Sequence, residues 1–125
     1  MNNPLEDALR IQKEAAALGF DWRVTQELWD KLAEEVEELK AAAKEGPERT
    51  QDELGDLLFM AVNLARHLGV DADAALHGAN AKFSRRFSQV CEFLSTYPPL
   101  GDSRRLDVME ARWQQAKQRE HKPLK

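Results

Sequence analysis

The sequence predicts an all-α protein. Residues that favour helices dominate the chain, and the regular alternation of apolar and polar residues that is typical of a half-buried strand is absent. Capping residues, glycines and prolines divide the chain into five segments of helical length. Because a chain of 125 residues can build one hydrophobic core but not two, we expect these helices to form a single domain over residues 1–125.

The first two helices are defined by the signals at their ends. Asn3 is suited to cap a helix whose first position is Pro4, and Gly19 follows its last residues. The second helix is expected over residues 25–45, because a Gly-Pro pair follows directly.

The third helix is expected to start at the pattern Thr50-x-x-Glu53, which resembles a capping box, and to end at Gly69. Its apolar residues cover more than one stripe of the helix surface. The residues left for solvent are Asp52, Asp56, Asn63 and Arg66. Because a small domain cannot cover so apolar a helix by itself, we expect a homodimer or a higher homo-oligomer that forms through the helices.

The last two helices are separated by a proline-rich turn. The fourth is expected over residues 73–95 and is ended by the sequence Tyr97-Pro98-Pro99, and the fifth begins near Asp102 or Ser103. The predicted buried stripe of the fourth helix consists of Leu76, Ala79, Phe83, Phe87, Val90 and Leu94.

Charge and composition limit the partners that we expect. The net charge of −4 gives no general affinity for nucleic-acid polymers or anionic membranes, which attract basic proteins. No apolar run approaches the length of a membrane span, and the N-terminal residues do not resemble a signal peptide. Since Cys91 is the only cysteine, no intrachain disulfide is expected, and we predict a cytoplasmic location.

Two acidic clusters are candidates for a metal site: Glu34-Glu35-x-x-Glu38 on the second helix and Glu53-x-x-Asp56 on the third. Residues three apart lie on one helical face, with roughly 5–6 Å between their Cβ atoms. Two carboxylates at that spacing can share a divalent cation. Two such pairs on adjacent antiparallel helices would place four carboxylates around one or two ions.

These acids also have a purely structural explanation. Acid-rich helical segments are usually solvated, but Glu35 lies at the margin of an apolar face and Glu53 shares a line with apolar residues. Carboxylates there cost several kcal/mol unless a cation or hydrogen bonds compensate. A capping box and the helix dipole would account for Glu53, but they explain neither Glu35 nor Asp56.

The type of ligand indicates the metal. All candidate ligands are carboxylates, and no cysteine or histidine cluster accompanies them, which disfavours zinc. Oxygen ligands favour Mg²⁺, with Mn²⁺ as a substitute. Because Mg²⁺ held by carboxylates usually also binds substrate phosphates, the acidic clusters indicate phosphate chemistry.

These motifs resemble those of the MazG-type nucleoside triphosphate pyrophosphohydrolases. The sequence Glu34-Glu35-x-x-Glu38, fourteen intervening residues, and Glu53-x-x-Asp56 match the acidic pattern of that family. Further stretches are similar to the second, C-terminal repeat of the long bacterial form: Gly19-Phe20-Asp21-Trp22, Asp56-Leu57-Leu58-Phe59, Asn63-Leu64-Ala65-Arg66, Asn80-x-Lys82-Phe83-x-Arg85-Arg86-Phe87, and Met109-Glu110-x-x-Trp113-x-x-x-Lys117. The resemblance covers nearly the whole chain, although the long form has two repeats and this chain has one.

The resemblance implies an all-α pyrophosphatase fold that dimerises through its helices. It implies Mg²⁺-dependent hydrolysis of a nucleoside triphosphate to the monophosphate and pyrophosphate, which removes aberrant or surplus nucleotides. By motif position, the metal ligands would be Glu35, Glu38, Glu53 and Asp56. The nucleotide-contacting residues would be Lys82, Arg86, Trp113 and Lys117.

The residue types are compatible with these roles, but alternatives remain. Lys82 and Arg86 are one helical turn apart and could meet two phosphates, or they could form a solvated basic edge. Trp113 could stack on a base or pack against another helix. Glu38 or Glu34 could orient the attacking water or accept its proton. A related diphosphatase specific for dUTP or dCTP, and a non-catalytic helical interaction module, are the rival functions.

Overall fold

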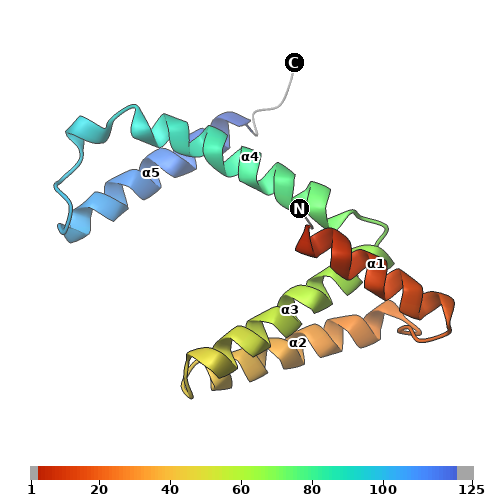
Figure 1. Cartoon of the computed structure of the whole chain (residues 1–125). Helices are drawn as coiled ribbons and strands as arrows, with labels where there is room; N and C mark the ends of the chain where they lie inside the picture. Colours follow the sequence, from red (N-terminus) through yellow and green to blue (C-terminus); the bar gives the residue numbers. More distant parts are fainter. Residues whose placement is uncertain (1–2, 121–125) are drawn as a thin grey trace. The chain divides into compact units, whose positions relative to one another are not determined.

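The computed structural model describes residues 3–120, and within this range it contains helices and no strand. The elements, in order, are α1 Pro4–Ala17, α2 Thr25–Ala42, α3 Pro47–His67, α4 Ala72–Cys91, the short 3-10 helix η1 Leu94–Thr96, and α5 Ser103–Glu120 (Figure 1). The predicted all-α class and the five helices are therefore confirmed. None of the helices in this range has the length and apolar character needed to cross a membrane.

The chain divides after Leu76 into two compact units. The first unit contains α1, α2, α3 and the first residues of α4. The second unit contains the remainder of α4, together with η1 and α5. The single domain expected over residues 1–125 stays a prediction.

In the first unit, α2 and α3 form an antiparallel hairpin, and α1 packs against α3 (Figure 1). The core of the hairpin includes Leu28 and Ala42 from α2, which are fully buried, and Val62 from α3. The expected cap of α1 is confirmed, because the Asn3 side-chain oxygen accepts a hydrogen bond of 2.9 Å from the backbone N–H of Leu5. The hairpin is the element that brings the two acidic clusters together.

The start of α3 differs from the sequence prediction. The helix begins at Pro47, because proline is well suited to the first helical position and Gly46 adopts a positive φ of 142° in the preceding turn. Thr50 therefore lies inside the helix, where its hydroxyl donates to the carbonyl of Gly46 at 2.7 Å. The predicted capping box was wrong. Glu53 lies near the end of the second turn, so capping does not explain its position.

A loop between α1 and α2 is fastened to the end of α3 by ion pairs. The Arg66 guanidinium donates to both carboxylate oxygens of Asp21, at 2.8 and 2.9 Å, and His67 lies 3.0 Å from the same carboxylate. These contacts hold the pKa of Asp21 well below its usual range. The prediction that Asn63 and Arg66 face solvent was wrong, because Asn63 is only 5% exposed and Arg66 is paired across the fold.

In the second unit, α5 runs antiparallel to α4 and contacts it mainly through side chains. The buried residues include Val90 and Ala116, and the Tyr97 hydroxyl donates to the carbonyl of Val90 at 2.7 Å. Of the stripe predicted to be buried on α4, only Val90 is buried, and Phe83 is 56% exposed. Two helices alone leave much of this stripe uncovered, which is why the prediction was wrong for most of its members.

Candidate metal centre

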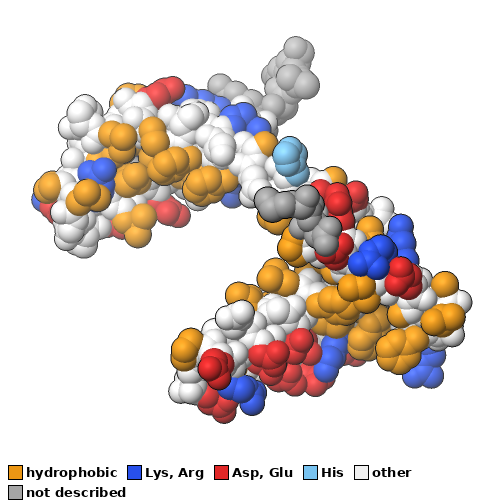
Figure 2. Space-filling model, viewed as in Figure 1, with side chains coloured by type: hydrophobic (Ala, Val, Ile, Leu, Met, Phe, Trp, Pro, Cys, Tyr) orange, Lys and Arg blue, Asp and Glu red, His pale blue; other side chains and the backbone are white. Residues whose placement is uncertain are grey.

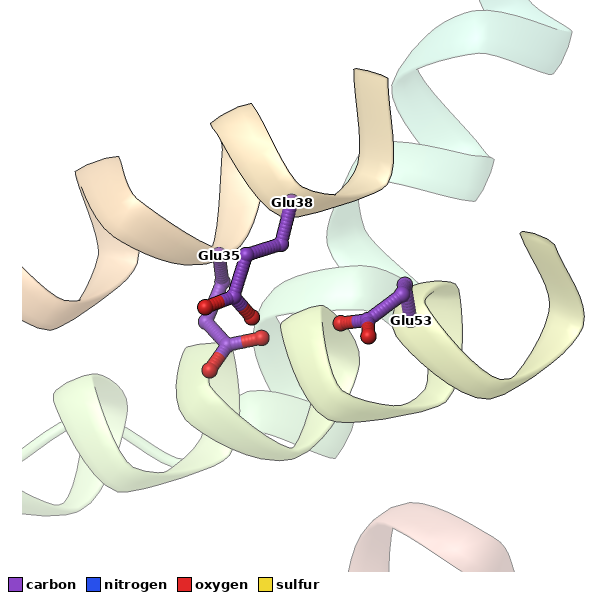
Figure 3. Close-up of side chains that lie close together, drawn as sticks. All are labelled: Glu35, Glu38 and Glu53. Atoms are coloured by element: carbon purple, nitrogen blue, oxygen red, sulfur yellow. The ribbon is translucent and has the colours of Figure 1, made fainter. Parts of the chain in front are cut away.

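The hairpin of α2 and α3 brings three glutamates together (Figure 3). Glu35 and Glu38 extend from α2, and Glu53 extends toward them from α3. Carboxylate oxygens of these three residues all lie within 4.8 Å of one another. We call this set the three-glutamate group. Figure 2 shows Asp and Glu side chains gathered over these two helices.

A second acidic group on α3 adjoins the first. Carboxylate oxygens of Asp52, Glu53 and Asp56 also lie within 4.8 Å of one another. Asp52 and Asp56 are exposed, whereas Glu53 is buried and belongs to both groups. The structure therefore brings three of the four predicted ligands into one cluster and connects Asp56 to it through Glu53.

Burial makes these acids unlike ordinary surface glutamates. Glu35 is 5% exposed and Glu53 is 9% exposed, while Glu38 is half-buried. Each buried acid has one cationic neighbour: the Lys31 ammonium lies 3.3 Å from Glu35 Oε1, and the Arg49 guanidinium lies 3.5 Å from Glu53 Oε1. The prediction that Glu35 and Glu53 lie on the apolar side of their helices, rather than on a solvated face, is confirmed.

The remaining oxygens of the two buried acids lack partners. Glu35 Oε2 and Glu53 Oε2 are buried and accept no hydrogen bond within the described part of the chain. An unsatisfied buried acceptor costs about 1–3 kcal/mol, and a charged acceptor costs more. A divalent cation compensates this cost directly. The groups therefore fit a metal ion, and their all-oxygen composition suits Mg²⁺ or Mn²⁺ better than zinc.

The pKa of Glu38 reflects the electrostatic repulsion inside the three-glutamate group. Burial, followed by the negative charges of Glu35 and Glu53, raises the pKa of Glu38 above its ordinary value. Lys31 opposes this shift only weakly. Ionisation of Glu38 is therefore less favourable beside the other two glutamates than in water. A bound cation would make it more favourable.

Two further acids, Glu34 and Asp52, lie near the three-glutamate group in the sequence. Glu34, a predicted catalytic candidate, lies outside the three-glutamate group; its carboxylate is 56% exposed and lies 3.2 Å from the Lys31 ammonium. Asp52 is exposed, as the sequence predicts, and its carboxylate also lies close enough to those of Glu53 and Asp56 to share a metal ion with them. The spacing of Asp52 and Asp56, four residues apart on one helix, was the available signal.

The predicted nucleotide-contacting residues lie in the second unit. Arg86 is only 8% exposed, and its Nε atom donates to Glu120 at 2.6 Å. Its guanidinium carbon lies 5.9 Å from the centre of the Trp113 ring. Lys82 is exposed and Lys117 is half-buried. The structure thus brings Arg86 and Trp113 together, and Arg85 and Arg86 lower the pKa of Glu120 to about 2.

Comparison with known proteins identifies relatives of the chain. The family model of the MazG nucleotide pyrophosphohydrolase domain matches residues 23–91, a segment that contains both acidic groups. The chain is 41% identical over 116 residues to the Escherichia coli K12 protein named nucleoside triphosphate pyrophosphohydrolase, which covers 90% of this chain and 44% of the relative. It is 38% identical over 119 residues to the Thermotoga maritima protein named nucleoside triphosphate pyrophosphohydrolase/pyrophosphatase MazG, covering 92% and 46%. The chain spans less than half the length of these relatives.

The raised pKa of Glu38 predicts a stability change that depends on pH and on metal. A raised pKa in the folded state means that folding disfavours the charged form, so the penalty appears as the pH rises through that pKa. At neutral pH without divalent ions, Glu38→Gln should therefore melt at a higher temperature than the parent protein. The difference should shrink as the pH falls through the raised pKa and should be absent below the ordinary glutamate value of 4.5, and Mg²⁺ should stabilise the parent more than the variant.

The matched control for this melting experiment is Glu37→Gln. Glu37 is exposed and pairs with Lys40 at 2.9 Å, away from the three-glutamate group, so its substitution should not alter the effect of Mg²⁺. A Glu38→Gln variant that melts at or below the parent temperature at neutral pH without metal would show that the repulsion is absent.

Proposed function

Because the chain belongs to the MazG nucleotide pyrophosphohydrolase family, we propose that it hydrolyses nucleoside triphosphates to the monophosphate and pyrophosphate. The observation that carries this proposal is the three-glutamate group, in which two buried carboxylate oxygens accept no hydrogen bond from residues 3–120. The names of the two longer relatives support the reaction class. A substrate triphosphate and the acidic groups are all anionic, so they can share a site only with cations between them.

The proposed ligands of these cations are Glu35, Glu38, Glu53 and Asp56, with Mg²⁺ as the resident ion and Mn²⁺ as a substitute. Bound Mg²⁺ supplies positive charge against the phosphates and makes water a stronger nucleophile at neutral pH. The helices contribute rigidity, since Glu35 and Glu53 are held in place by the packing of α2 against α3. Preorganised carboxylates lose little freedom when they bind an ion.

Glu38 is the proposed proton acceptor for the attacking water. It is half-buried, so it can reach a water molecule at the edge of the three-glutamate group to which it belongs. Glu34 is the second candidate, but Lys31 already pairs with its carboxylate. The reaction needs no covalent nucleophile on the protein.

The second unit supplies the proposed contacts to the nucleotide. Arg86 binds one carboxylate oxygen of Glu120 at 2.6 Å, and the same planar guanidinium chemistry suits a phosphate. Lys82 would add an exposed positive charge four residues earlier on α4. Trp113 and Lys117 complete the proposed set on α5.

The biological role that we propose is the removal of aberrant or surplus nucleotides in the cytoplasm. Two other functions remain as rivals: a diphosphatase restricted to dUTP or dCTP, and a helical module without catalysis. A pyrophosphate-release screen over canonical and damaged nucleotides separates them. Turnover of several bases supports the broad reaction, one favoured pyrimidine supports the first rival, and no turnover with Mg²⁺ supports the second.

Self-association is also part of the proposal. Three large apolar residues of α3 remain exposed within the chain: Leu54 at 44%, Leu58 at 54% and Phe59 at 40%. A second copy is the proposed cover for this face. At micromolar concentration, sedimentation should report a species of about twice the 14.2 kDa chain mass or larger. A monomer that turns over substrate would contradict the proposed assembly.

Removing one ligand charge should stop catalysis without unfolding the protein. Glu38→Gln and Asp56→Asn keep the side-chain size but remove the negative charge. Substitution of residues that only support the metal ligands typically lowers metal affinity or activity by about 10- to 100-fold. Loss of a ligand itself should therefore lower kcat/KM by about 100-fold or more. Pyrophosphate release measures the effect, circular dichroism checks the fold, and Glu37→Gln is the control that should retain activity. Full activity in either ligand variant would exclude that residue from the centre.

A further inference from the structure

In the second unit, one carboxylate bridges two arginines of α4. Glu120, the last residue of α5, accepts a hydrogen bond of 2.7 Å from Arg85 Nε and another of 2.6 Å from Arg86 Nε. Each arginine contacts a different oxygen of the carboxylate. Hydrogen bonds between ionised groups are about twice as strong as neutral ones, so these two contacts are a firm connection between α4 and α5.

The two arginines depend on Glu120 to different degrees. Arg86 is buried, whereas the Arg85 side chain is 56% exposed and in contact with water. A buried guanidinium is unfavourable without an anionic partner, and within residues 3–120 that partner is Glu120. Removal of the Glu120 carboxylate should therefore displace Arg86 more than it affects Arg85.

The position of Glu120 on its helix indicates that the arginines, and not the helix, hold its carboxylate. The C-terminal end of a helix carries a partial negative charge, which disfavours an acid in the last turn. The Glu120 side chain is nevertheless only 20% exposed, and the hydrogen bonds from Arg85 and Arg86 lower its pKa to about 2. Glu120 is therefore ionised and paired at neutral pH.

The contact with Glu120 leaves one edge of the Arg86 guanidinium available. Glu120 accepts from Nε, and in the part of the chain that the structure describes the terminal nitrogens Nη1 and Nη2 make no hydrogen bond. The parallel N–H groups of these two nitrogens are suited to bind a phosphate in a bidentate manner. The guanidinium carbon also lies 5.9 Å from the centre of the Trp113 ring, within the range of a cation–π contact.

We propose that Glu120 is a positioning residue for the nucleotide: it holds Arg86 so that the terminal nitrogens of the guanidinium face a substrate phosphate, and it stays paired when the phosphate binds. This inference rests on the proposed function, in which Arg86 contacts the nucleotide. Two arginines and one glutamate leave a net positive charge that attracts an anion. An arginine that is already held in place loses less conformational freedom on binding.

The opposite role for Glu120 would be that of a competitor. If its carboxylate occupied the place of the phosphate, the substrate would have to displace it, and removal of the carboxylate would strengthen binding. The use of Nε by Glu120 favours the positioning role, because the terminal pair of nitrogens is left for the phosphate. The two roles therefore predict affinity changes of opposite sign.

The test is a double-mutant cycle between Glu120 and Arg86. Affinity is measured by calorimetry, with Mg²⁺, for an α,β-methylene analogue of a nucleoside triphosphate and for inorganic tripolyphosphate. Glu120→Ala should bind both about 10-fold or more weakly, because Arg86 is no longer held. In the Arg86→Ala background, the same substitution should no longer weaken binding, since the residue that it positions is gone.

Three comparisons separate this role from a general effect on the fold. Asp107→Ala makes a similar truncation at an exposed position of α5 and should bind as the parent does. Mn²⁺ binding should be unchanged in Glu120→Ala, because Glu120 lies outside both acidic groups. Glu120→Gln keeps an acceptor for one arginine and should lose less affinity than Glu120→Ala. If Glu120→Ala does not fold, Glu120→Gln replaces it in the cycle, and its smaller loss should also vanish with Arg86→Ala.

Three results would overturn the positioning role. Unchanged or tighter binding by Glu120→Ala would show that the carboxylate is dispensable or competes with the phosphate. An equal loss with and without Arg86 would show that Glu120 only stabilises the fold. Unchanged affinity in Arg86→Ala would remove the phosphate contact itself. Failure of the proposed function is distinct, because the parent would then neither bind tripolyphosphate with Mg²⁺ nor release pyrophosphate.

Discussion

The packing of glutamate carboxyl groups between two helices is the constraint on which the rest of the site depends. Glu35 and Glu53 are buried where α2 meets α3, and one oxygen of each has no donor in the part of the chain that the structure describes. Lys31 and Arg49 each contact only the other oxygen. The hairpin therefore encloses a local excess of acidic groups. A divalent cation bound there would stabilise the hairpin, and without the cation the clustered acids are unfavourable.

The same helix connects this charge to the loop after α1. Along α3, the acidic residues are followed by Met60 and Asn63, and the helix ends at the residues that fasten the loop after α1. The acidic groups and the contacts that hold this loop therefore lie on one helix.

The sequence predicted what depends on local signals. The helices, the cap at Asn3 and the burial of Glu35 follow from end signals and periodicity. The capping box at Thr50 was wrong because Pro47 offered an earlier start to α3. The burial of Asn63 was missed because it depends on Arg66 and Asp21, which are 45 residues apart in the chain and therefore show no local pattern.

The central claim is that the three-glutamate group holds a divalent cation. Titration with Mn²⁺, followed by electron paramagnetic resonance, measures that binding without any substrate. The parent protein and Glu37→Gln should bind Mn²⁺ alike, because Glu37 lies outside the three-glutamate group. Glu53→Gln should lose most of this binding, because Glu53 belongs to both acidic groups. Equal Mn²⁺ binding by all three proteins would contradict the account.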